Sequence, residues 1–236
     1  MKKLIEYYNT LAREYDKIYK NKSIEYMRII EQEILNSEVK KNYLILDIGC
    51  GTGEQLNYLR DYNILGLDIS LEMAKRAKNK TGKFLFVGNA EYLPFKNKSF
   101  NCVISLFGAL NHVQINRAFK EVRRVLTKNG VFIFSIANVY NLGWIIGSLK
   151  KRGLTKTKRA IEHKKGDIVK YVGGNRIKVN TKFYSIRDIE NILKKYNFYI
   201  KYTFGTNITN SPLDRVIYKT FLKNFGAYIG AVAIRK

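Results

Sequence analysis

Short apolar stretches alternate with amphipathic ones along most of this chain. From Leu4 to Leu35, apolar and aromatic residues recur every three or four positions, with an interruption at 21–23. This spacing predicts two amphipathic helices. The run at 43–48 is mostly apolar and leads into glycines, which is typical of a strand buried on both faces of a parallel sheet.

The order of a short apolar strand and then a helical segment is repeated through the middle of the chain. Strands that alternate with helices indicate βαβ units and a doubly wound α/β sheet. The predicted strands are 64–68, 84–87, 101–107 and 131–136, and the predicted helices are 71–78, 113–126 and a segment through Trp144.

This alternation stops after residue 138. A short apolar helix within 138–149 precedes a basic stretch, and 168–172 and 177–181 flank Gly-Gly-Asn as hairpin strands would, so we interpret the region as an insertion. The wound pattern resumes at Ser185-Ile-Arg-Asp188, which is similar to a capping box with Asp in place of Glu. The last predicted elements are a helix to Tyr196 and the strands 199–204 and 227–234.

The composition narrows the class of protein. The chain has 236 residues, 46% of them hydrophobic, so it can bury a sizeable core and is not mainly disordered. Its two cysteines, Cys50 and Cys102, give neither a disulfide framework nor metal-site spacing. Glu6 interrupts the start where a signal peptide would be apolar, and no apolar run reaches the ~18–20 residues of a membrane span, so we expect a cytoplasmic protein.

Positive charge is concentrated in the second half of the chain. The formal net charge is +24, of which residues 1–100 carry +4 and residues 101–236 carry +20, with +9 in 149–180 alone. A local basic field attracts nucleic acid or an anionic membrane surface. The alternative is an AT-rich genome, which would favour lysine codons and leave these residues as ordinary solvated surface.

A glycine-rich run joins the first predicted strand to a helix that opens at Glu54. In Asp47-Ile-Gly-Cys-Gly-Thr-Gly-Glu54, the glycines allow a sharp turn and close approach of a ligand at the carboxyl end of the strand. Glu54 stands where a dinucleotide fingerprint needs its third glycine, and no Lys follows as in a P-loop. Asp68 ends the second strand and can accept both hydroxyls of a ribose, so the two features together predict a nucleoside site.

At these positions the chain resembles the Rossmann-like (class I) S-adenosylmethionine-dependent methyltransferases, in particular the group that includes quinone-ring and wobble-uridine tRNA methyltransferases. The resemblance implies an α/β fold with a doubly wound, mostly parallel seven-stranded sheet, an antiparallel last strand, N-terminal helices and an insertion after the fifth strand. The matching stretches, in order, are LILDIGCGTG (44–53), GLDIS (66–70), GNAEYLPFKNKSF (88–100), VISLFGALNHV (103–113) and EVRRVLTKNGVFIFS (121–135).

The resemblance also implies which residues hold the cofactor, S-adenosylmethionine. It assigns Asp47, Gly49, Cys50, Gly51, Gly53, Asp68, Ile69, Met73, Asn89, Ala90, Leu106 and Tyr15. Asn89 stands where the family usually has Asp, and its side-chain oxygen can also accept a hydrogen bond from the adenine amino group. Tyr15 is the best match to an aromatic lid over the cofactor, although Tyr7, Tyr8, Tyr15 and Tyr19 could each be packing residues instead.

Methyl transfer from a sulfonium mainly requires alignment and exclusion of water, so no metal is expected. A general base is needed only where the acceptor atom must lose a proton. His112, just after the fourth strand, is the candidate for a proton-accepting or substrate-contacting role; the alternative is a histidine that only shapes the pocket. His163, beside two lysines, is expected to be solvated.

We expect one methyltransferase domain, 1–236, with four parts. They are an N-terminal helical lid (1–38), a cofactor-binding core (39–137), a basic substrate-side insertion (138–182) and the C-terminal part of the sheet (183–236).

The basic insertion makes RNA the first hypothesis for the methyl acceptor, with Tyr171 or Trp144 stacking on bases. The cations expected to follow the phosphates are Lys150, Lys151, Arg152, Lys158 and Arg159. A second hypothesis is a small molecule or lipoquinone at an anionic membrane, because an apolar stretch (142–149) precedes these charges. A third is a catalytically silent, cofactor-binding scaffold.

Overall fold

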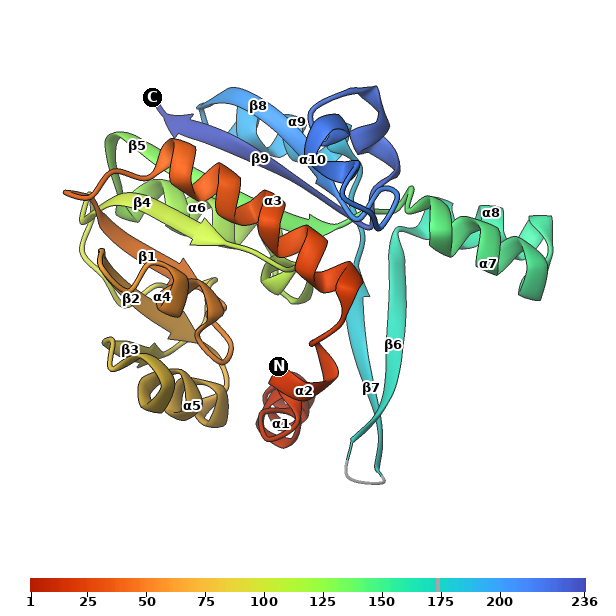
Figure 1. Ribbon diagram of the computed structural model, residues 1–236, viewed down its shortest axis with the longest axis horizontal. Helices are drawn as coiled ribbons and strands as arrows, with labels where there is room; N and C mark the ends of the chain where they lie inside the picture. The colour runs from red at the N-terminus through yellow and green to blue at the C-terminus, as the bar shows by residue number, and fades with distance from the viewer. Residues whose placement is uncertain (173–174) are drawn as a thin grey trace.

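The computed structural model describes residues 1–172 and 175–236, and only the backbone within 165–172 and 175–177. Its main sheet has seven strands in the order β3-β2-β1-β4-β5-β9-β8 (Figure 1). Their bounds are β1 Leu44–Ile48, β2 Asn63–Asp68, β3 Leu85–Val87, β4 Phe100–Ser105, β5 Leu126–Ala137, β8 Phe198–Thr206 and β9 Tyr228–Arg235. Strands β1 to β5 pair in parallel, and β9 is antiparallel to both of its neighbours, which confirms the predicted α/β fold.

Helices cover both faces of this sheet. Their bounds are α1 Lys2–Leu11, α2 Tyr15–Ile18, α3 Lys22–Glu38, α4 Glu54–Tyr58, α5 Leu71–Thr81, α6 Ile115–Val125, α9 Ile186–Lys195 and α10 Asp214–Ile217, with 3-10 turns η1 Ala109–His112 and η2 Phe221–Phe225. Phe132 and Phe134 of β5 pack in one core cluster with α6 and α9. Ile133, between them, packs in a second cluster with α3, α4 and α5. Successive residues of a strand point to opposite faces, so a strand between two helical layers must be apolar throughout.

The N-terminal segment forms three helices where two were predicted. The break expected at 21–23 lies at 19–21, because the Asn21 side chain caps α3 by accepting a hydrogen bond from the Ile24 N–H at 3.1 Å and the helix begins at Lys22. A second break, at 12–14, separates α1 from the single turn α2. The helical periodicity continues through this break, so the pattern of apolar residues did not reveal it.

The insertion consists of two helices and a hairpin. Helices α7 (Leu142–Arg152) and α8 (Leu154–His163) project together from one end of the sheet, and β6 (Lys165–Val172) and β7 (Asn175–Lys182) pair antiparallel as predicted (Figure 1). Gly173 and Gly174, the predicted turn, lie outside the described residues. Val179 of β7 packs in a cluster with Leu4, Tyr7 and Leu11 of α1, so the hairpin and the N-terminal helix lie against each other. No helix in 1–172 or 175–236 is long and apolar enough to cross a membrane.

The predicted capping box at the start of α9 is present. The Ser185 hydroxyl accepts from the Asp188 N–H at 3.2 Å, and the Asp188 carboxylate accepts from the Ser185 N–H at 2.7 Å. Two backbone N–H groups that the helix leaves unpaired therefore have acceptors, and Asp188 takes the place of the Glu that usually accepts from the N-cap residue.

Replacing Ser185 with Ala should lower the free energy of unfolding by about 0.5–2 kcal/mol, because the Asp188 N–H loses its acceptor. Chemical denaturation followed by circular dichroism measures this change. Thr155→Ala removes an exposed hydroxyl near the start of α8 and should cost less than ~0.5 kcal/mol. Equal losses in the two variants would contradict a stabilising role for the capping box.

Candidate functional site

A pocket of about 960 Å³, open to solvent, lies where the carboxyl ends of β1, β2 and β4 meet; we call it the strand-end pocket. The structure brings most of the predicted site residues together there. The predicted residues that line it are Tyr15, Gly49, Cys50, Gly51, Asp68, Ile69, Met73, Asn89, Ala90, Leu106 and His112. Asp47 and Gly53 are not in the lining.

The three glycines of the loop after β1 do different work. All have positive φ angles, of 72°, 53° and 86° for Gly49, Gly51 and Gly53. A Cβ on Gly49 would overlap that of Ala109, and a Cβ on Gly53 would lie 3.1 Å from Ala77, so these two glycines allow close packing. A Cβ on Gly51 would meet nothing within 4 Å. Gly51 therefore exposes its backbone to the open space of the pocket, as a ligand cradle requires.

Asp68, at the end of β2, ties this loop to the neighbouring helix. Its Oδ2 accepts from the Gly51 N–H at 2.9 Å and its Oδ1 accepts from the Ser70 N–H at 2.8 Å. Ser70 in turn caps α5 by accepting from the Met73 N–H at 3.1 Å. Burial raises the pKa of Asp68, and the hydrogen bonds from Ser70 and Gly51 oppose that rise. Since each carboxylate oxygen can accept more than one hydrogen bond, Asp68 keeps acceptor capacity for two adjacent hydroxyls.

Two further carboxyl groups are buried here: Glu31 lines the pocket, and Asp47, in β1, precedes the lining residue Ile48. Burial raises the pKa of Asp47 to about 8 and that of Glu31 to about 7. Among the described residues, neither Oδ2 of Asp47 nor Oε2 of Glu31 has a hydrogen-bond partner. Arg28, the cation beside Glu31, is 3.5 Å from Glu54. Buried carboxyl groups without partners favour a cationic ligand, so the site fits the ammonium and sulfonium groups of S-adenosylmethionine.

The analysis of the sequence missed Glu31. It lies four positions after Met27 on the buried side of α3, and its Oε1 accepts from the Ser135 hydroxyl at 2.7 Å. An acid on the apolar stripe of an amphipathic helix was the available signal. Phe107 was missed as well; it lines the pocket with a positive φ of 58°, which is uncommon for a bulky residue.

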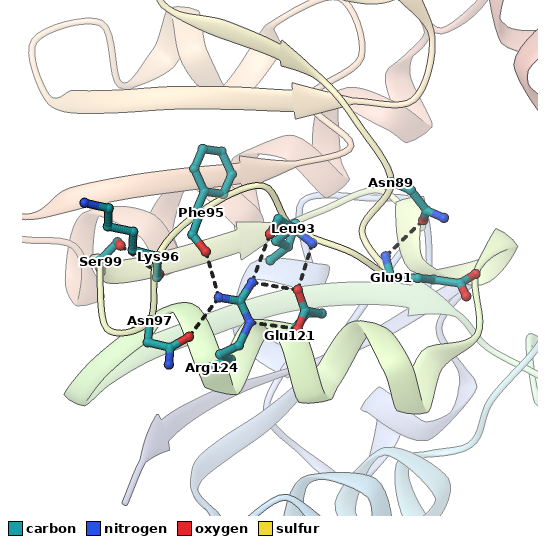
Figure 2. Close-up of polar contacts among 9 residues, drawn as sticks. All are labelled: Asn89, Glu91, Leu93, Phe95, Lys96, Asn97, Ser99, Glu121 and Arg124. Atoms are coloured by element: carbon teal, nitrogen blue, oxygen red, sulfur yellow. Dashed lines mark hydrogen bonds and ion pairs between the residues drawn. The ribbon is translucent and has the colours of Figure 1, made fainter.

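The loop after β3 is held rigidly on the pocket wall. The Arg124 guanidinium donates to the carbonyl oxygens of Leu93 and Phe95 at 2.9 and 2.7 Å, and Glu121 accepts from the Leu93 N–H at 2.8 Å (Figure 2). These bonds attach the loop to α6. The Asn89 side-chain oxygen accepts from the Glu91 N–H at 2.9 Å, so it has a backbone partner besides any ligand, which the sequence did not predict (Figure 2).

A second cavity, of about 630 Å³, adjoins the first; we call it the aromatic pocket. Its lining includes Tyr7, Tyr8, Tyr15, Tyr19, Phe107 and Tyr228. Ring centroids lie 4.5 Å apart for Tyr15 and Tyr19, 5.3 Å for Tyr19 and Phe107, and 5.4 Å for Phe107 and Tyr228. Burial raises the pKa of Tyr8, Tyr15 and Tyr228, so these hydroxyls are neutral. The N-terminal tyrosines thus both pack together and line a cavity.

His112 lies at the boundary, because it lines both pockets. Its Nδ1 is 3.1 Å from the carbonyl oxygen of Asn180 on β7. A carbonyl oxygen can only accept, so Nδ1 carries the proton and Nε2 is the basic nitrogen of the neutral ring. His163 is exposed at the end of α8.

Other predicted features lie away from the two pockets. The cations expected to contact phosphates are exposed on α7 and α8 and line neither cavity; they are Lys150, Lys151, Arg152, Lys158 and Arg159. The side chain of Tyr171 lies outside what the structure describes. Within the described part of the chain, no group of three or more His, Cys, Asp or Glu residues is arranged to hold a metal ion.

Comparisons with known proteins agree with this geometry. A family model described as a methyltransferase domain matches residues 46–134. An uncharacterized protein of Methanocaldococcus jannaschii is 58% identical over 97% of this chain and 89% of its own length. A ubiquinone/menaquinone biosynthesis C-methyltransferase of Campylobacter jejuni is 26% identical over 93% of this chain and 92% of its own.

Solved structures share the fold. An S-adenosylmethionine-dependent methyltransferase of Thermotoga maritima superposes with a TM-score of 0.69 at 19% identity, over 97% of this chain and 98% of its own. A Pyrococcus horikoshii protein gives 0.62 at 25% identity, over 92% and 95%. With the glycine-rich loop, Asp68 and the wound sheet, these findings show that the chain belongs to the class I S-adenosylmethionine-dependent methyltransferases.

Proposed function

We propose that the protein transfers a methyl group from S-adenosylmethionine in the strand-end pocket to a small molecule in the aromatic pocket. The observation that carries this proposal is that the two cavities adjoin and share Tyr8, Tyr15, Phe107 and His112. An acceptor in the second cavity would thus lie next to a methyl group held in the first.

In the strand-end pocket, Asp68 would accept hydrogen bonds from the ribose hydroxyls, Ile69 and Met73 would contact the adenine ring, and Asn89 and Ala90 would contact its edge; all five residues line the pocket. Gly49, Cys50 and Gly51 would present backbone to the methionine end. The Glu31 carboxylate, which lines the pocket, would pair with its positive charge, and Asp47, outside the lining, would add negative charge nearby once ionised. Bound S-adenosylmethionine supplies a methyl group on a cationic sulfur, which keeps the electron pair of the broken bond. Segment 1–38 covers the site as a lid, and Tyr15 contributes to both cavities.

The protein's own chemistry is alignment, dehydration and, where the acceptor loses a proton, removal of that proton by Nε2 of His112. The Asn180 carbonyl fixes the tautomer that makes this possible. No Lys, Arg, Asp or Glu lines the aromatic pocket among the described residues, which favours an uncharged, ring-containing acceptor over an ionic one.

The relatives also favour a small acceptor. The C-methyltransferase named for ubiquinone and menaquinone biosynthesis matches 93% of this chain, whereas a Bos taurus protein described as a probable tRNA methyltransferase matches 39%. RNA is the second candidate, because the exposed cations of α7 and α8 could follow a phosphate backbone.

The acceptor is tested by incubating the protein and radiolabelled S-adenosylmethionine with a small-molecule and lipid extract or with total RNA. We expect label in the extract. Where the acceptor loses a proton, His112→Gln should lower turnover about 10²–10⁴-fold, far more than it lowers cofactor affinity. His163→Gln, at the chain's only other histidine, should have no effect. Label in RNA alone would overturn the small-molecule proposal.

Asp68→Asn should weaken binding of S-adenosylmethionine and S-adenosylhomocysteine by about 1.5–3 kcal/mol, because the charged acceptor of the ribose hydroxyls is lost. Calorimetry measures the affinity. Asp61→Asn removes the same charge from an exposed position and should leave affinity unchanged. Unaltered binding by Asp68→Asn would mean that Asp68 only organises the loop and α5.

Cofactor affinity should rise as the pH increases from 5.5 to 7.5. The raised pKa values of Glu31 and Asp47, about 7 and 8, mean that both groups are largely protonated at low pH, and each must release its proton before its negative charge can attract a cation in the pocket. Titration calorimetry in buffers of different ionisation enthalpy detects the released protons.

Without cofactor, the contribution of Glu31 and Asp47 to stability should be complete below their ordinary pKa values, near pH 4, and should be lost as the pH rises through about 7–8, because the folded state holds their protons more tightly than the unfolded chain does. Glu31→Gln should reduce both the pH dependence of affinity and this loss of stability. Glu25→Gln, at an exposed position on the same helix, should change neither. A wild-type affinity that does not vary with pH would contradict a role for these carboxyl groups.

A further inference from the structure

Helix α7 exposes an apolar face that neither pocket uses. Leu142, Ile146 and Leu149 follow one another at helical spacing and are 45%, 46% and 38% exposed. The other side of α7 packs on α8, where the hydroxyls of Ser148 and Thr157 lie 2.9 Å apart. Leu154, at the start of α8, is 73% exposed. The apolar surface is therefore on the outside of the insertion.

Exposed positive charge follows this face along the chain. The last turn of α7 carries Lys150, Lys151 and Arg152, and α8 adds Lys156, Lys158 and Arg159; all six are exposed. Among the described side chains, no carboxylate forms an ion pair with any of them. Glu162 is the single acid between 142 and 163.

The position of the two helices leaves this surface accessible. They project from the end of the sheet, while α1, α2 and the hairpin lie elsewhere (Figure 1). Among the described residues, none from α7 or α8 lines either pocket. The surface can therefore be covered without closing the site.

We propose that α7 and α8 dock the enzyme on an anionic membrane surface. A lipid interface offers acyl chains to Leu142, Ile146 and Leu149 and acidic headgroups to the flanking cations, and it therefore matches both halves of the pattern. RNA would neutralise the cations but leave the apolar side chains in water.

The test uses the full chain and sedimentation with vesicles of equal parts phosphatidylglycerol and phosphatidylcholine, compared with pure phosphatidylcholine. We expect binding to the anionic vesicles only, weakened by salt. Two variants should each reduce partitioning about ten-fold or more. One removes apolar side chains (Ile146→Ser with Leu149→Ser), and the other removes positive charges (Lys150→Ser with Lys151→Ser and Arg152→Ser).

Matched controls remove equivalent groups elsewhere. The apolar control changes two exposed residues of the C-terminal region (Val216→Ser with Phe221→Ser). The cationic control removes three exposed lysines from other elements (Lys120→Ser with Lys128→Ser and Lys194→Ser). Both controls should partition within about two-fold of wild type. All variants should keep the wild-type thermal unfolding and cofactor affinity, which shows that they are folded.

Four results would overturn the proposal. One is no partitioning of the wild-type chain, and another is equal loss in the controls. The third is binding of tRNA that is lost in the variant without the three cations but kept in the Ile146→Ser, Leu149→Ser variant, while vesicle binding is unchanged in both variants. This result would make the surface an RNA-binding site. The fourth is a wild-type chain that does not bind vesicles and is a dimer in analytical ultracentrifugation, where Ile146→Ser with Leu149→Ser converts the dimer to a monomer. This result would assign the face to a second copy of the chain.

Discussion

One buried carboxylate, that of Asp68, holds the functional edge of the sheet together. It bonds to the loop after β1 through the Gly51 N–H and to the start of α5 through the Ser70 N–H. The backbone adds a parallel tie, because the Gly49 N–H donates to the Leu67 carbonyl at 2.7 Å. The glycine loop, the cap of α5 and the floor of the strand-end pocket all depend on this arrangement, so one side chain serves both the fold and the ligand site.

Asn111 performs the corresponding task for the aromatic pocket. Its side chain is buried, donates to the Lys182 carbonyl at the end of β7, and accepts from the Ala137 N–H at the end of β5 at 2.9 Å. These bonds fix the hairpin against the sheet and place Asn180 beside His112. Residues from the lid, the core and the insertion therefore meet at one wall, although they lie far apart in the sequence.

The parts of the molecule that could be predicted are those encoded by neighbouring residues. Doubly buried strands such as β1 appear as apolar runs, the turn at Gly51 needs glycine, and the cap at Ser185 is a four-residue pattern. Glu31 was marked in the sequence only by its place on the apolar stripe of α3. Its burial depends on how α3 crosses the sheet, since a helical acid usually faces solvent. The Arg124 bonds to the loop after β3 also arise only from tertiary packing.

The insertion leaves and rejoins the sheet at almost the same place. Asn138 and Tyr184 form a β-bridge, the Val139 N–H donates to the Tyr184 carbonyl at 3.0 Å, and the Tyr184 N–H donates to the Ala137 carbonyl at 3.1 Å. A segment closed at its base can change length at a small entropic cost to the rest of the chain. The insertion is therefore structurally separable from the sheet. A different insertion between the same two strand ends would replace one wall of the aromatic pocket and the outer surface of α7 together, and it would leave the strand-end pocket unchanged.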